Sequence, residues 1–284
     1  MAVFGDDFRR AGREWLYPHP QQSMQWVLRA SLLFVGLFVI YNVLQIFFGL
    51  AIFRVVLGGS LSDLAHSNQD GMAKFIKAGL LAILPSAIPT VLLALAVAKF
   101  GLPQRAGRLP IQLPKLGWLG WFIVVSGFLV VSFAAFQGVF AALGIDPAAY
   151  APSSDGLSDK NSLAGLVEKA MADLSKDPKL YTFVTLSAAV AAPAVEELLF
   201  RGALFAALVQ SPVGRFGAVL ITAALFGLAH AFTDGWPIVI VLFLMGISLG
   251  VLLLRFGSIW VTIACHSAWN AVQSLALYAI GTHS

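Results

Sequence analysis

Long apolar stretches separated by short polar loops are the feature that most constrains the fold of this chain. They cover approximately residues 26–58, 75–99, 117–143, 181–209, 215–233, 237–255 and 258–281. A helix needs about 20 apolar residues to cross the hydrocarbon core of a bilayer, and lipid offers no partner for an unpaired backbone group. The pattern therefore predicts an all-α, polytopic transmembrane helical bundle of about seven spans, or of eight if the long first stretch breaks near Gly49.

The composition excludes a soluble globular protein. Hydrophobic residues make up 59% of the 284 residues and charged residues only 11%, whereas an ordinary soluble domain is about 25% charged. The net charge of +4 does not indicate nucleic-acid binding, because the Lys and Arg residues lie in short loops between apolar stretches. The single cysteine, Cys265, cannot form an internal disulfide and gives no indication of an oxidising compartment.

The basic residues predict the topology. They precede the first stretch, surround the loop before the third and mark two later loops: Arg9, Arg10, Arg13, Lys99, Arg105, Arg108, Lys115, Arg215 and Arg255. These loops alternate with others that are poor in Lys and Arg, so the N-terminus is expected in the cytoplasm. No apolar segment precedes about residue 26, and no cleavable signal peptide is expected. Compact loops favour a prokaryotic plasma membrane.

The expected organisation has three parts: a cytoplasmic segment at 1–25, N-terminal transmembrane helices at 26–180, and a C-terminal transmembrane core at 181–284. The second part includes a long outer loop at 144–180, where Asn161 or Ser162 could cap a short helix. One face of that helix is apolar and is expected on the membrane surface or against the bundle, with substrate gating as the alternative; it comprises Leu163, Leu166, Val167, Met171 and Leu174.

A pair of glycines in the sixth stretch indicates close helix packing. Gly246 and Gly250 stand four residues apart, which lets another helix approach closely. Packing within the chain is the expected use, and dimerisation is the alternative.

The fourth stretch carries the first cluster of ionisable residues, within PAVEELLFRG. Charges at bilayer depth are costly and therefore indicate function. Glu197 and Arg201 lie on one helical face and can neutralise each other, whereas Glu196 is rotated by about 100° and has no partner in its own helix. An unpaired carboxylate in a low-dielectric site suits a general base. Pro193 removes a backbone hydrogen bond just before the pair. A structural bridge, with Glu196 a bystander, is the alternative.

Two later stretches also place polar side chains at depth. His230 lies near the end of the fifth stretch, one turn after Phe226, and a lone histidine there would more often be a packing residue. The last stretch carries a polar stripe with spacings of four, four and three: Thr262, His266, Asn270 and Gln273. The stripe must face the bundle interior or a wet cavity, because lipid cannot satisfy it. Hydrogen bonding between helices is the alternative use.

Convergence of these clusters would supply a base, two groups that can hold water or a metal, and an amide donor. Depth is the difficulty for this hypothesis. Counting about 1.5 Å per residue from the cytoplasmic helix ends puts Glu196 and His230 at about 20 Å, but His266 at about 12 Å. The predicted helix ends or the tilt of the last helix must differ if the three residues are to meet.

Taken together, EExxxR, FxxxH and HxxxN occur in this order on separate apolar stretches. The set resembles the CPBP intramembrane proteases, also called CAAX-protease and bacteriocin-processing or Abi proteins, over about residues 181–281. The resemblance implies an endopeptidase that cuts a peptide or protein, lipidated or not, near the cytoplasmic membrane face. A non-catalytic scaffold or bacteriocin-immunity-type protein is the alternative. A proton-coupled transporter is a third reading, without an inverted repeat to support it.

The resemblance also implies roles for the water-activating residues. Glu196 would activate the attacking water, and His230 would help to hold it. Two histidines and a carboxylate suit a divalent metal such as zinc, with Glu196, His230 and His266 as candidate ligands. The sequence has no HExxH motif, and a metal-free glutamate mechanism stays open beside the metal-dependent one.

The remaining residues of the implied site are supporting ones. His266 and Asn270 would complete the site and stabilise the oxyanion. Glu197 and Arg201 would orient Glu196. No nucleic acid is expected as a partner, and membrane lipid surrounds the chain.

Overall fold

The computed structural model describes residues 24–60, 62, 69–100, 110–146, 166, 170, 173–209, 211–231 and 235–281. The N-terminal basic residues, Arg105, Arg108 and the expected helix cap at Asn161 or Ser162 lie outside these ranges. Within them the chain forms helices and no strand. The all-α fold class is therefore confirmed for the part of the chain that the structure describes.

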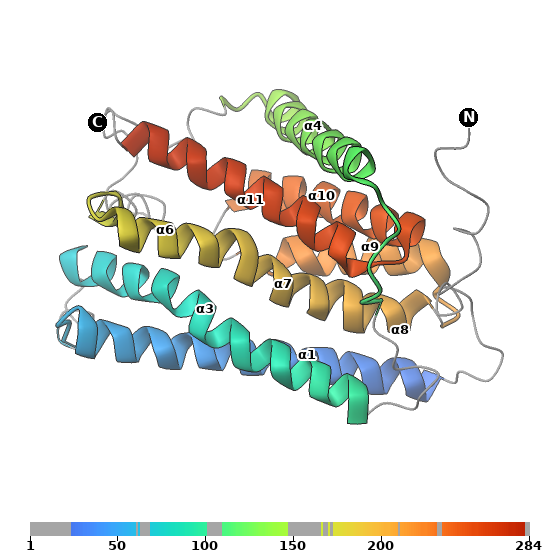
Figure 1. The fold of residues 1–284 in the computed structure, drawn as a ribbon, viewed down its shortest axis with the longest axis horizontal. Coiled ribbons are helices and arrows are strands. Elements are labelled where there is room, and N and C mark those ends of the chain that lie inside the picture. The colour runs from blue at the N-terminus through green and yellow to red at the C-terminus, as the bar shows by residue number, and fades with distance from the viewer. Residues whose placement is uncertain are drawn as a thin grey trace.

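The helices follow the predicted apolar stretches closely (Figure 1). The first three apolar stretches form α1 (Met24–Ala51) with its π-helical continuation η3 (Ile52–Val56), α3 (Gln69–Phe100) and α4 (Trp118–Leu143). The fourth is one continuous but composite rod of α6 (Pro178–Leu186), η5 (Ser187–Ala191), α7 (Ala192–Glu197), η6 (Leu198–Phe205) and α8 (Ala206–Val209). The last three are α9 (Gly214–Leu228), α10 (Gly235–Phe256) and α11 (Ile259–Gly281).

Five of these rods are long and apolar enough to cross a membrane: Val27–Val56, Asp70–Ala96, Trp118–Leu143, Pro178–Val209 and Trp236–Phe256. Helix α1 runs through Gly49 without a break, so the predicted interruption there is wrong. The stretch predicted at 215–233 holds a helix of only 15 residues, which at about 1.5 Å per residue is about 22 Å long. This is shorter than the hydrocarbon core of about 30 Å, so α9 is too short to cross it alone.

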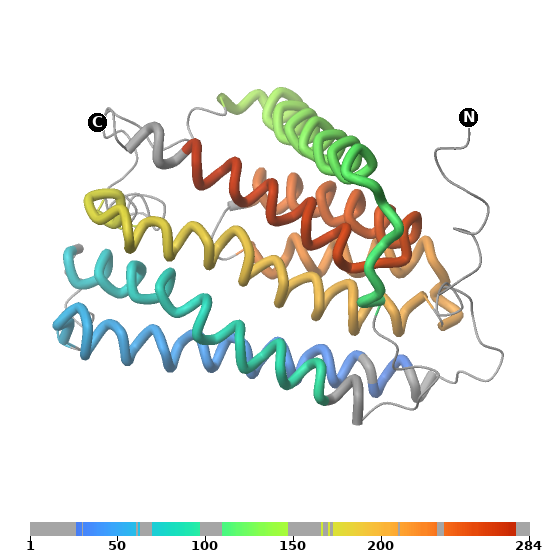
Figure 2. Tube along the Cα trace, viewed as in Figure 1, coloured from blue at the N-terminus to red at the C-terminus, as the bar shows by residue number. Residues whose placement is uncertain are grey.

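The composite fourth rod occupies the centre of the bundle (Figures 1 and 2). The α1–α3 pair packs on one side of it and α9, α10 and α11 lie on the other. Helix α4 lies at the periphery against α10 and α11, and only 11% of its span is buried. The largest buried hydrophobic cluster includes residues of η6, α8 and the helices on both sides of the rod. This central position holds the Glu-Glu pair between two groups of helices.

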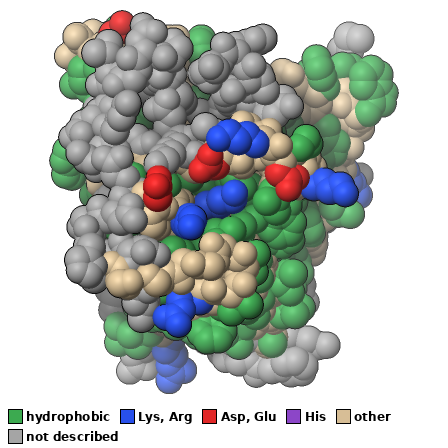
Figure 3. Space-filling model, turned by 90° about the vertical axis from the view of Figure 1, so that its left-hand side faces the viewer, with side chains coloured by type: hydrophobic (Ala, Val, Ile, Leu, Met, Phe, Trp, Pro, Cys, Tyr) green, Lys and Arg blue, Asp and Glu red, His purple; other side chains and the backbone are tan. Residues whose placement is uncertain are grey.

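The outer surface is that of an integral membrane protein. Large apolar side chains are exposed along the flanks of the bundle, as at Leu32, Phe47 and Val130, which a lipid solvent would accommodate. Charged side chains gather at one end of the molecule (Figure 3). Lys and Arg there are interspersed with Asp and Glu, as in the exposed Lys176–Asp173 pair at 2.9 Å.

Part of the apolar face predicted within the 144–180 loop packs on the bundle. Leu166 and Leu174 are buried, and Leu174 joins a small cluster with Leu81, Tyr181 and Val184. The other members of that face, Leu163, Val167 and Met171, lie outside the described residues. Of the two locations expected, packing against the bundle is the one observed for Leu174.

The two glycines of α10 are used for packing inside the chain. A Cβ at Gly246 would lie 2.9 Å from the Cα of Ala223 on α9, and one at Gly250 would lie 3.3 Å from the side chain of Val219. The expectation of internal packing is therefore confirmed. Backbone cannot move aside as a flexible side chain can, so Gly246 sets how closely α9 and α10 approach.

We expect Gly246→Ala to lower the free energy of unfolding by about 1–3 kcal/mol, the usual cost of overpacking a tight contact. Gly127→Ala on α4 is the matched control, because nothing lies within 4 Å of its added Cβ. Denaturant unfolding of both variants in detergent micelles measures the difference. Equal stability of the two variants would mean that the helices separate at no cost.

Candidate active site

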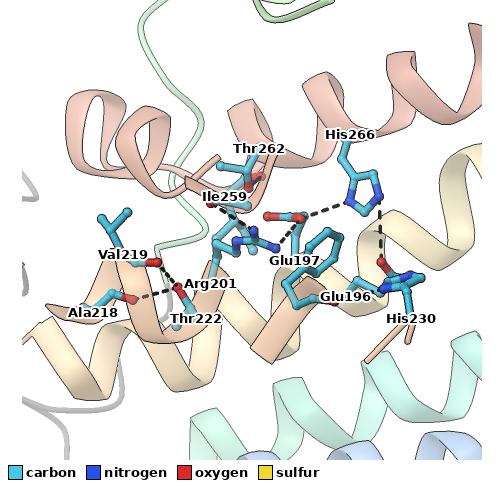
Figure 4. Close-up of polar contacts among 12 residues, drawn as sticks. Glu196, Glu197, Arg201, Ala218, Val219, Thr222, His230, Ile259, Thr262 and His266 are labelled. Carbon is cyan, nitrogen blue, oxygen red and sulfur yellow. Dashed lines mark hydrogen bonds and ion pairs between the residues drawn. The ribbon is translucent and has the colours of Figure 1, made fainter. Parts of the chain in front are cut away.

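The neighbouring glutamates of α7 lie in different surroundings (Figure 4). The Glu197 side chain is completely buried, whereas that of Glu196 is 21% exposed. Glu197 accepts a hydrogen bond of 2.9 Å from Nη1 of Arg201, so the predicted pairing along the helix is confirmed. Glu196 Oε2 is buried and accepts no hydrogen bond from the part of the chain that the structure describes.

Arg201 connects the pair to the helices behind it. Its side chain is fully buried, Nη2 donates to the Gly246 carbonyl at 3.3 Å, and Cζ lies 4.6 Å from the centroid of the Phe226 ring. The guanidinium therefore compensates the Glu197 charge and also stacks on an aromatic face, which favours a buried cation. The close approach of α9 and α10 at Gly246 brings both partners within its reach.

His266 of α11 stands between the two glutamates. Its Nδ1 lies 3.0 Å from Glu197 Oε1, and its Nε2 lies 3.8 Å from Glu196 Oε2. Because an ionised carboxylate can only accept, Nδ1 carries the proton of this hydrogen bond. A neutral imidazole then turns its Nε2 lone pair toward Glu196. The depth difference expected from counting residues is wrong, since helices of different length and tilt do not end in one plane.

His230 lies in the turn that follows the short helix α9. Its Nδ1 donates to the Phe226 carbonyl at 2.9 Å, since a carbonyl can only accept. In the neutral ring Nε2 is therefore an acceptor. The Phe226 ring lies 5.2 Å from the His230 ring and 5.5 Å from the His266 ring, centroid to centroid. Phe226 thus contacts both imidazoles, and Figure 4 shows His230 and His266 on the Glu196 side of the site.

The polar stripe of α11 is only partly turned inward. Thr262 is completely buried and lies beside the Glu197 carboxylate. The Asn270 side chain donates to the Ala188 carbonyl of η5 at 3.0 Å. Gln273 is exposed, so its predicted place in the interior is wrong. At that level α11 contacts α6 through Ser274, whose carbonyl accepts a 2.6 Å hydrogen bond from the Tyr181 hydroxyl.

Two residues near the site were not predicted. Tyr41 of α1 is buried, interacts with the Ser86 side chain of α3 and lies within electrostatic reach of the Glu196 carboxylate. Ser86 is completely buried. Both residues are upstream of the motif-bearing region, and single hydroxyl groups in apolar helices give no signal in a sequence. Only the packing of α1 and α3 on the fourth rod reveals them.

Glu196, His230 and His266 are the candidate metal ligands of the sequence. Within the described ranges, no group of three or more His, Cys, Asp or Glu side chains could hold a metal ion. His266 uses Nδ1 on Glu197, and its Nε2 is 3.8 Å from Glu196 Oε2. Zinc would need its oxygen and nitrogen ligands at about 2.0–2.2 Å from one point. The 3.8 Å between the Glu196 and His266 donors is compatible with such distances, but no third donor completing a metal site was found among the described residues, so no catalytic step is assigned to a metal.

The fold and the site together define an integral membrane protein with a buried carboxylate–imidazole centre enclosed by transmembrane helices. Residues 178–272 match the family model described as type II CAAX prenyl endopeptidase Rce1-like. The match over this segment supports the resemblance to the CPBP family of CAAX-type proteases, whose members cleave peptide or protein substrates. No curated protein and no solved structure matches the chain.

Proposed function

We propose that the protein is an intramembrane endopeptidase in which Glu196 activates water to hydrolyse a peptide bond near the cytoplasmic membrane face. The observation that carries this proposal is the pair of acceptors on facing helices. Glu196 Oε2, buried and without a hydrogen-bond donor among the described residues, lies 3.8 Å from His266 Nε2. This separation is too long for a direct hydrogen bond, and one water can donate to both atoms.

Glu196 takes one proton from this water as its oxygen attacks the carbonyl carbon of the substrate, and later delivers that proton to the leaving amine. The water has two hydrogens, so His230 Nε2, an acceptor in the neutral ring, helps to hold it by sharing with His266 Nε2 the hydrogen that is not directed at Glu196. A general base that also returns the proton to the leaving group raises the rate of the reaction by about 10²–10⁴-fold.

The supporting residues act on the oxyanion and on His266. His266 Nε2 accepts a hydrogen bond from the hydrogen that stays on the attacking oxygen, while Nδ1 stays on Glu197, so His266 holds the tetrahedral intermediate beside the oxyanion. Arg201 holds Glu197 in turn, so this pair orients His266 directly and Glu196 through it. Asn270 uses one amide N–H on Ala188, and its second N–H, without an acceptor among the described residues, can serve the oxyanion.

The N-terminal segment 1–25 is proposed to lie in the cytoplasm of a prokaryotic plasma membrane, with helices of 26–180 supporting the core at 181–284. This orientation puts the α8 end of the fourth rod on the cytoplasmic side. A substrate segment would then reach Glu196 from that side.

Purified protein in lipid vesicles, offered a library of membrane-anchored peptides with and without a C-terminal prenyl group, tests the function. We expect cleavage at an internal bond, detected by mass spectrometry. A strong zinc chelator should leave the rate unchanged, because the proposed mechanism moves protons through Glu196 alone.

Asp173→Asn is the matched control for this assay. It changes a carboxylate to an amide in an exposed ion pair outside the site and should cleave as fast as the parent. Loss of activity on chelation, restored by added zinc, would contradict the metal-free mechanism. A correctly folded protein that cleaves no member of the library would favour the non-catalytic scaffold.

A further inference from the structure

The π-helical turn η5 leaves a backbone carbonyl without a helical donor. In a regular α-helix the Ala188 carbonyl would accept from the Ala192 N–H. That N–H bonds instead to the Ser187 carbonyl, five residues back. The next donor in the π pattern would be residue 193, which is Pro193 and has no N–H. The N–H of Ala191, which lies within the π turn, likewise donates to a carbonyl five residues earlier in the chain and is not a partner for Ala188.

Asn270 supplies the donor that the helix lacks. Its Nδ2 donates to the Ala188 carbonyl at 3.0 Å, across the interface between α11 and the fourth rod. An unpaired carbonyl inside a membrane bundle would cost several kcal/mol. The hydrogen bond from Asn270 removes this cost and so stabilises the π turn. Asn270 stands one helical turn after His266 on the same helix.

The π turn determines which way the catalytic carboxylates point. One extra residue in a helical turn rotates everything that follows by about 100° relative to a regular α-helix. Glu196 and Glu197 follow the turn directly on α7, and their neighbouring positions also differ by about 100°. Loss of the π turn would therefore rotate both carboxylates away from their present positions at Nδ1 and Nε2 of His266.

We propose that Asn270 is a positioning residue: by bonding the Ala188 carbonyl it holds the π turn that directs Glu196 toward His266 Nε2. Helix α11 thus contacts the fourth rod at two levels, through His266 at the carboxylates and through Asn270 at the turn that orients them. This inference rests on the proposed function, and it gives Asn270 a role separate from donation to the oxyanion.

A double-mutant cycle between Asn270 and Pro193 tests the proposal. Asn270→Ala is expected to lower kcat about 10- to 100-fold with KM changed less than about threefold. Pro193→Ala restores an N–H at the position that can donate to Ala188 in the π pattern. In that background Asn270→Ala should cost at least about fivefold less in kcat than it does in the parent, because the carbonyl has a new partner.

The pH profile of kcat/KM separates positioning from a merely structural role or from oxyanion donation. Its acid limb reports the base of the free enzyme, so displacing Glu196 from His266 should shift that limb in Asn270→Ala and return it in the double variant. Gln273→Ala, an exposed amide on the same helix, should change neither kcat nor the profile. Unfolding midpoints of every variant identify any that fail to fold.

Equal loss of kcat on both backgrounds, with an unmoved pH profile, would overturn the positioning role and leave oxyanion donation. If Pro193→Ala does not fold, the proposal is tested by the acid limb of the kcat/KM pH profile of Asn270→Ala alone. An unshifted limb then overturns the proposal. A parent protein without cleavage activity would overturn the proposed function itself. The two failures are therefore distinguishable.

Discussion

Glu196→Gln is expected to lower the rate of peptide cleavage by about 10²–10⁴-fold, the range typical for loss of a general base. The amide has the same shape as the carboxylate but cannot take a proton from water. Since Glu196 Oε2 accepts no hydrogen bond from the described residues, the substitution breaks no hydrogen bond at that atom. The unfolding midpoint should therefore stay close to that of the parent, and single-turnover cleavage in lipid vesicles measures the rate.

Two further variants make this prediction specific. Glu196→Asp keeps the carboxylate but withdraws it by one methylene group, so activity should fall less than in Glu196→Gln. Asp173→Asn, at the exposed pair with Lys176, should have the parent rate. Cleavage by Glu196→Gln at half the parent rate or more would remove Glu196 from the mechanism.

Arg201→Met is expected to lower the free energy of unfolding by about 3–5 kcal/mol, the usual cost of removing one partner of a buried ion pair. Both side chains of the Arg201–Glu197 pair are completely buried, so the remaining carboxylate would be left uncompensated. The variant also loses the hydrogen bond to the Gly246 carbonyl and the stacking on Phe226. Denaturant unfolding in detergent micelles provides the measurement.

The double variant Glu197→Gln/Arg201→Met separates charge from packing. Because it leaves no unpaired charge, it should be more stable than Arg201→Met alone. Lys176→Met is the control at an exposed ion pair, where a change of no more than about 1 kcal/mol is expected. A loss for Arg201→Met as small as that of Lys176→Met would show that the buried pair does not stabilise the bundle.

The local features of the site could be predicted because they depend on one helix at a time. The Glu197–Arg201 pair follows from a spacing of four residues, and the burial of Thr262 and His266 follows from the cost of polar groups in lipid. The glycines of α10 likewise indicated close packing, although not which helix would approach. Gln273 shows the limit of this reasoning. The polar spacing along α11 continues to this residue, but neighbouring helices no longer cover the helix there.

The contacts between helices could not be predicted. Residue counting put His266 and Glu196 at different depths, yet His266 Nε2 and Glu196 Oε2 lie 3.8 Å apart. Hydropathy gave no sign that α9 would end after 15 residues, which places His230 in a turn beside Phe226. Tyr41 and Ser86 carry no motif, so their proximity to the site depends entirely on how α1 and α3 pack.

The amino-acid sequence is enough to predict a helical membrane bundle with charges on the inner faces of its last helices, because lipid tolerates neither unpaired backbone groups nor exposed charges. The three-dimensional packing was needed to see that His266 Nδ1 bonds the carboxylate that Arg201 already pairs with, and that Glu196 lies at His266 Nε2 without a direct hydrogen bond. The reason is geometric, because one π turn before Pro193 rotates the residues that follow by about 100°. The spacing of apolar residues in the sequence does not predict such a turn.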